Sequence, residues 1–98
     1  MLNTLALFPS KIDAAALDDL VANAVAALKT ADGLLSLEVN EGQMMSAGGP
    51  PLYSKVILAK FKSLETFMAW VETPAAQANK DKMVSNGVVR LFFNVAEL

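Results

Sequence analysis

Two side chains that could take part in chemistry stand out in this 98-residue chain. Tyr53 carries its only phenol, which can donate a proton or bind a ligand, although a tyrosine at the start of a strand equally suits an interface. Asn3 is a polar residue in an apolar, strand-like segment, where asparagine is disfavoured. No Ser/His/Asp set, GxGxxG or phosphate-binding motif supports either residue. Tyr53 and Asn3 are therefore kept as candidates, and the catalytic residues stay unassigned.

The absence of histidine and cysteine from the sequence narrows the chemistry further. Without cysteine there is no disulfide, no thiolate nucleophile and no thiolate ligand for zinc or an iron–sulfur cluster. Without histidine the chain lacks the commonest metal ligand and the usual general base near neutral pH. We expect no metal site and no bound cofactor.

Charge and hydropathy indicate which partners to expect. The net charge is −2, from eight basic and ten acidic residues, and without a basic stripe nucleic-acid binding is not expected. No apolar run reaches the ~20 residues that span a bilayer. Residues 2–8 lack the basic start and cleavage site of a secretory signal, so we expect a cytoplasmic protein without membrane contact. Because 54% of the residues are hydrophobic, we expect the apolar excess to be covered by self-association.

Charged residues inside the predicted strands are Glu38, Lys55 and Arg90. Since burial of a charge requires compensation, one interpretation is that they form ion pairs across neighbouring strands or across a dimer. The alternative is a polar cluster that binds an anionic or carbonyl ligand. Residues 80–82 read as a solvated helix surface.

The first half of the chain predicts a strand, a helix and a second strand. Residues 2–8 form the first strand, ended by Pro9, and Ser10 or Asp13 can cap a helix that runs to about Thr30. Its apolar residues recur at helical spacing: Leu17, Leu20, Val21, Ala24 and Leu28. Gly33 is placed where a left-handed residue would end this helix. Residues 34–40 alternate as a strand, with Leu35, Leu37 and Val39 on one face, and 41–51 form a long loop.

The second half of the chain repeats this order with a divided helix. Residues 53–61 predict a strand, and Ser63 caps a short helix that contains the only tryptophan. Thr73 and Pro74 then cap and start a second helical piece, which ends near Asn86 and Gly87. Residues 88–96 form the last strand. The resulting βαββαβ order predicts an α+β, ferredoxin-like fold, as one domain over 1–98: a four-stranded antiparallel sheet with helices on one face.

Both sides of the predicted strands are apolar, and this predicts a dimer. In the last strand Val89, Leu91 and Phe93 alternate with Val88, Arg90 and Phe92. Helices can cover only one side of the sheet, so the other would expose a large apolar patch on a monomer. Pairing of two such sheets face to face covers it; the pattern does not say which side meets the helices.

Four segments, in this order and spacing, resemble the dimeric α/β-barrel superfamily over nearly the whole chain. They are the opening strand 2–8, the second strand 32–39, residues 61–65, and 70–77, which is similar to an aromatic–Pro–His segment. The chain is most similar to the stress-responsive A/B barrel domain. The antibiotic-biosynthesis monooxygenase branch shares the architecture and also matches Phe67-x-x-Trp70.

The resemblance also marks where this chain departs from its relatives. Thr4 and Ala76 stand where A/B barrel domains often carry histidine, and Trp70 stands where the polyketide cyclases carry a tyrosine that works with the second histidine. Asn3 and Trp70 match two pocket residues of haem-degrading relatives, but Lys80 replaces their haem-ligating histidine. The resemblance therefore does not extend to acid–base chemistry of that type or to haem binding.

The resemblance implies a pocket between sheet and helices, lined by Thr4, Phe67, Trp70 and Ala76. For Phe67 and Trp70, which share one helix face, core packing is the competing interpretation. The expected function is a homodimeric small-molecule-binding protein with a small apolar or aromatic ligand. One alternative is a cofactor-free monooxygenase or polyketide-cyclase-like enzyme that acts on a hydroxyaromatic or polyketide substrate. The other is a purely structural dimer.

Overall fold

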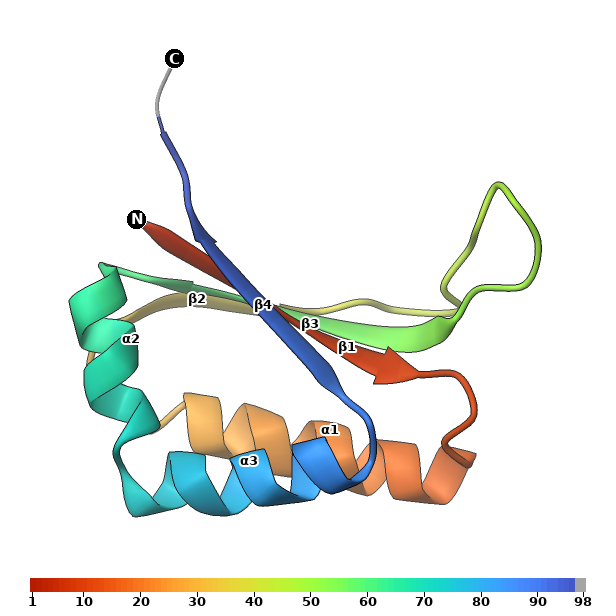
Figure 1. Cartoon of the computed structure of the whole chain (residues 1–98), viewed down its shortest axis with the longest axis horizontal. Coiled ribbons are helices and arrows are strands. Elements are labelled where there is room, and N and C mark those ends of the chain that lie inside the picture. The colour runs from red at the N-terminus through yellow and green to blue at the C-terminus, as the bar shows by residue number, and fades with distance from the viewer. Residues whose placement is uncertain (97–98) are drawn as a thin grey trace.

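The first strand of the chain lies inside the sheet, with a neighbour on each side. In the computed structural model, which describes residues 1–96, β1 (Leu2–Pro9) pairs antiparallel with both β3 (Tyr53–Phe61) and β4 (Val89–Asn94). The remaining strand, β2 (Leu34–Val39), pairs with the other side of β3, which gives the order β2-β3-β1-β4 (Figure 1). The predicted ferredoxin-like α+β architecture is confirmed.

Three helices cover one face of this sheet, and each begins at a predicted cap. α1 (Ala14–Leu28) starts after Asp13, and α2 (Leu64–Val71) after Ser63, which forms a reciprocal capping box with Thr66. α3 (Pro74–Ser85) follows Thr73 as N-cap, with Pro74 in its first turn, where the missing N–H is not needed. Figure 1 shows α1 and α3 beneath the sheet, where they pack against each other, and α2 at one end.

The even-numbered residues of β1 lie on the side of the sheet that faces the helices. Leu2, Thr4, Ala6 and Phe8 are all buried, whereas the residues between them are half-buried. This settles the orientation that the sequence pattern left open: the even-numbered residues of β1 and β4, which pair with each other, face the helices. In β3 the odd-numbered residues Ile57, Ala59 and Phe61 are buried on that side.

An aromatic cluster closes the core beneath α2. The Phe61 and Phe67 rings pack edge to face with centroids 5.1 Å apart, and the Trp70 ring lies 5.9 Å from Phe61. The Trp70 indole N–H donates to the Ala27 carbonyl at 3.0 Å, which joins α2 to the end of α1. Core packing of Phe67 and Trp70 is therefore confirmed.

Three local predictions need correction. α1 ends at Leu28, and Gly33 has no left-handed backbone; it is needed because a Cβ there would lie 2.5 Å from the Thr66 Cβ. The register shifts between Leu34 and Ser36, so Leu35 is exposed instead of sharing a face with Leu37 and Val39. β4 is shorter than the predicted 88–96 strand.

Among residues 1–96 no helix is both long enough and apolar enough to cross a membrane.

Candidate functional site

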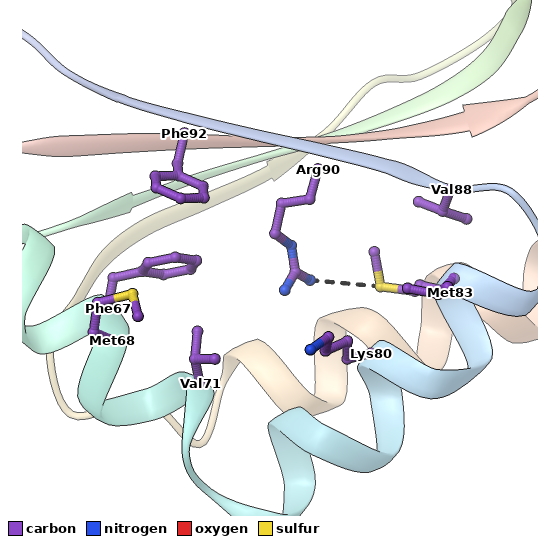
Figure 2. A pocket seen from close by; sticks show the side chains of 9 residues that line it. Phe67, Met68, Val71, Lys80, Met83, Val88, Arg90 and Phe92 are labelled. Carbon is purple, nitrogen blue, oxygen red and sulfur yellow. Dashed lines mark hydrogen bonds between the residues drawn. The ribbon is translucent and has the colours of Figure 1, made fainter.

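A cavity of about 270 Å³ lies where β4 passes over α2 and α3 (Figure 2). Its wall is mostly apolar, with one aromatic ring from α2 and one from β4. The lining residues are Phe67, Met68, Val71, Lys80, Met83, Val84, Val88, Arg90 and Phe92. Ligand pockets in proteins are typically apolar hollows of roughly this size or larger with a few polar groups.

The cavity exists because the helices do not fill the space under β4. Phe92 pairs with Thr4 across the strands and so faces the helix side, yet 51% of its surface is exposed. Its ring contacts Phe67 of α2, with centroids 5.3 Å apart. Thr4, by contrast, is buried under the same helical layer. The edge strand therefore roofs a hollow, while the inner strands meet packed side chains.

Arg90 is the principal polar group of this cavity. It pairs with Ala6, which places it on the helix-facing side, and Figure 2 shows its side chain reaching into the hollow. Its Nη2 donates to the Met83 sulfur at 3.5 Å, and its guanidinium carbon lies 5.5 Å from the centroid of the Trp70 ring. Burial lowers the pKa of the Arg90 guanidinium, because removal from water disfavours the charged form.

The charge in the cavity has one sign. Lys80, from the exposed side of α3, is the other ionisable residue of the wall, and among residues 1–96 no aspartate or glutamate belongs to the wall. The prediction that Lys80 is only a solvated surface residue was incomplete, since its side chain also borders the hollow. Among residues 1–96 no group of three or more acidic, histidine or cysteine side chains is placed to hold a metal ion.

The four residues predicted to line a pocket lie together in the core, but only Phe67 reaches this cavity. Thr4 and Ala76 are buried, and the Thr4 hydroxyl donates to the Ala59 carbonyl at 3.2 Å. Trp70 borders a different hollow beside Gly33 and Thr66, and its indole N–H is engaged by the Ala27 carbonyl. Their ligand contacts stay a prediction.

The two catalytic candidates lie away from the cavity. Tyr53 begins β3 at the end of the sheet where the 40–52 segment projects (Figure 1), and it borders two other hollows with Met44 and Pro51. Asn3 pairs with Phe93 on the sheet face that the helices leave open, and its Oδ1 is buried without a hydrogen-bond partner. The fold therefore brings neither residue to Arg90.

The sequence did carry a signal for the cavity residues. Val88, Arg90 and Phe92 alternate on one side of the last strand, and Arg90 was among the three strand charges considered for an anionic ligand. The expected partners do not assemble: the Lys55 Nζ donates to the Asn40 carbonyl, and Arg90 to a sulfur. The alternation of residues along the strand could not show that Met83 of α3 lies opposite Arg90.

Comparisons with known proteins support the fold. No protein-family model matches the chain, and no curated protein matches its sequence. An ethyl tert-butyl ether (ethd) family protein from Bacillus halodurans is 19% identical, with TM-score 0.76 and coverage of 98% of this chain and 99% of that one. A dimeric ferredoxin-like protein of unknown function from Thermobifida fusca is 14% identical, with TM-score 0.74 and coverage of 96% and 90%.

An enzyme is also among these structural neighbours. SnoaB, a cofactor-independent oxygenase from Streptomyces nogalater, is 11% identical, with TM-score 0.72 and coverage of 99% of this chain and 94% of that one. At these identities the likeness concerns the backbone, and it extends over almost the full length of all three structures. The chain has a ferredoxin-like fold like that of these proteins, as the sequence predicted.

Proposed function

We propose that this chain is a homodimeric protein that binds a small apolar or aromatic molecule in the cavity under β4. The observation that carries this proposal is the hollow of about 270 Å³ with its apolar wall. Aliphatic and aromatic side chains make up most of its wall, which is the usual composition of a ligand pocket. The Phe67 and Phe92 rings offer a flat ligand two aromatic surfaces.

Native mass spectrometry of the purified protein, followed by ligand-observed NMR with a panel of neutral and charged ring compounds, tests the proposal. Val88 is a buried lining residue, so Val88→Phe should narrow the cavity and weaken binding. Leu52→Phe, at an exposed loop position, is the matched control and should leave binding unchanged. Absence of any binding, or equal binding by folded Val88→Phe, would contradict a ligand site here.

The open face of the sheet supports the dimer. On β4 alone Val89, Leu91 and Phe93 are exposed there, and half-buried Leu5, Leu7 and Leu58 continue the apolar surface across β1 and β3. Two such faces can cover each other, and the neighbour from Thermobifida fusca is described as dimeric. Light scattering at several concentrations should give twice the mass of one chain; a monomer throughout would overturn this part.

A second candidate function is a cofactor-free oxygenase or a polyketide cyclase. The observation that favours it is Arg90, because a fixed positive charge in an apolar hollow stabilises an enolate or phenolate as it forms. Tyr53 and Asn3 lie elsewhere, so Arg90 would carry the electrostatic role. Oxygen consumption with hydroxyaromatic substrates, lost in Arg90→Gln, supports this function. If neither turnover nor binding is found, the purely structural dimer is favoured.

A further inference from the structure

We propose that the ligand of the cavity under β4 is an organic carboxylate with an apolar ring, and that the Arg90 guanidinium holds its carboxylate group. This inference rests on the proposed small-molecule site and specifies the chemistry of its ligand. It follows from the sign of the charges in the wall, from the partners of Arg90, and from where the aromatic rings lie relative to it.

Arg90 has far more hydrogen-bonding capacity than the protein uses. A guanidinium carries five N–H donors in a planar fork, yet among residues 1–96 its only side-chain hydrogen bond runs to the Met83 sulfur, at 3.5 Å. A thioether sulfur is a weak acceptor. A half-buried charge without a counter-charge is unfavourable. The Arg90 guanidinium is therefore available to pair with an anion from outside these residues.

A second copy of the chain on the open sheet face does not supply that partner. Arg90 pairs with buried Ala6 and so lies on the helix-facing side of β4, whereas Val89 and Leu91 lie on the side where a second copy would pack. The thickness of the sheet separates the two. Since no acidic residue among residues 1–96 lines the cavity, the anion that pairs with Arg90 in this proposal belongs to a molecule bound there.

The guanidinium is held ready for such an anion. Its carbon lies 5.5 Å from the centroid of the Trp70 ring, within the range of a cation–π contact. Trp70 is fixed in turn by its hydrogen bond to the Ala27 carbonyl, and the Met83 sulfur is fixed by a hydrogen bond from Asn79. A planar fork held in place matches the two oxygens of a carboxylate better than a single oxyanion.

The rest of the wall defines the body of the ligand. Phe67 and Phe92 lie on the α2 side of Arg90 in Figure 2, with Met68 and Val71 beside them. These four side chains suit an apolar ring attached to the carboxylate. Lys80, across the hollow on α3, adds a second positive charge, and within the described part of the chain no acidic residue lines the hollow. The site should therefore favour anionic over neutral and cationic molecules.

Isothermal titration calorimetry with 1-naphthoate and its neutral isostere 1-naphthamide tests this inference on the full chain. The wild type should bind naphthoate about tenfold or more tightly than the amide, the range of a charge-assisted bidentate contact. Arg90→Gln should remove the preference, and Arg90→Lys should keep only part of it. Lys62→Gln removes an exposed cation outside the cavity and should leave both affinities unchanged.

The outcomes separate the two proposals. Equal binding of amide and carboxylate by the wild type, or an unchanged preference in folded Arg90→Gln, overturns the carboxylate assignment and leaves a neutral-ligand site. If the wild type binds neither compound, and native mass spectrometry detects no copurified molecule that Val88→Phe loses, the ligand site itself fails and the inference fails with it. Circular dichroism of each variant establishes that it is folded.

Discussion

β1 and β4 are antiparallel neighbours in one sheet, yet they have opposite surroundings. Every second residue of β1 is buried and the rest are half-buried, because β3 and β4 flank it and the helices cover its even-numbered side. In β4 the residues are exposed on both sides, and only Arg90 is half-buried. The two strands have similarly apolar sequences, so composition alone does not decide which one is buried.

The difference shows that β4 has uncovered apolar surface on both of its sides. β4 carries the open apolar face on one side and the roof of the cavity on the other. A dimer partner and a ligand would therefore contact opposite sides of the same strand, through side chains of adjacent residues. Four experiments test this contrast.

The largest effect should come from equivalent truncations in the two strands. Phe8→Ala removes a fully buried ring from β1 and should lower the free energy of unfolding by about 3–5 kcal/mol. Phe92→Ala in β4, half exposed and in contact with Phe67, should cost about 1 kcal/mol. Urea unfolding curves measure both. Equal losses would mean that β4 is as well packed as β1.

A charge on the open side of β4 should separate the dimer. Leu91→Glu places a carboxylate in the middle of the proposed interface, where burial without a partner is unfavourable. We expect roughly a hundredfold or greater weakening of association, measured by analytical ultracentrifugation. Met45→Glu, at a highly exposed loop position, is the control and should remain dimeric. A fully dimeric Leu91→Glu would place the interface elsewhere.

Removal of the charge on the other side of β4 should stabilise the ligand-free protein. Burial lowers the pKa of Arg90, so the charged form is disfavoured in the fold at every pH below that value. Arg90→Met removes this penalty and loses a cation–π contact, for a net gain of about 1 kcal/mol, or a rise in Tm of several degrees. Calorimetry measures it; a large drop in Tm would show that Arg90 is structural.

The smallest effect concerns pH. The lowered pKa of Arg90 still belongs to a guanidinium, which stays protonated in proteins near neutrality, and the chain has no histidine or cysteine. Naphthoate affinity should therefore be flat between about pH 6 and pH 9, and should fall only near about pH 4, where the ligand itself becomes protonated. A midpoint near neutral pH would indicate a different binding group.

Much of the fold was predictable because its signals are local. Asp13, Ser63 and Thr73 are caps that the sequence identifies, and Pro74 marks the break between α2 and α3. Alternation in the last strand divided its residues between two faces, without indicating which face meets the helices. The role of Gly33 was misinterpreted. A glycine is needed there because of the close approach of Thr66, which is distant in sequence. The shift at Leu35 likewise depends on pairing with β3.

The candidate site was predictable only in part, since it depends on what the helices fail to cover. Phe67 borders the cavity, but Thr4, Trp70 and Ala76 were predicted from resemblance to proteins with histidines at or near these positions. Here these three side chains are buried and lie outside this cavity. Arg90 was recognised as a charge that needs compensation. The sequence could not show which side chains surround Arg90. In the folded chain its neighbours in the cavity include Met83 and Lys80, and no carboxylate among residues 1–96 pairs with it.

The place of β1 in the sheet also affects how this chain can fold. Its two partners are β3 and β4, and the pairing extends to Leu2 with Asn94, so the sheet depends on contacts between the two ends of the described chain. Such topologies pay loop-closure entropy before their contacts form and fold slowly. During synthesis β1 can pair with β3 first, but its other edge stays unpaired until β4 has emerged, and in that interval this edge is exposed to aggregation.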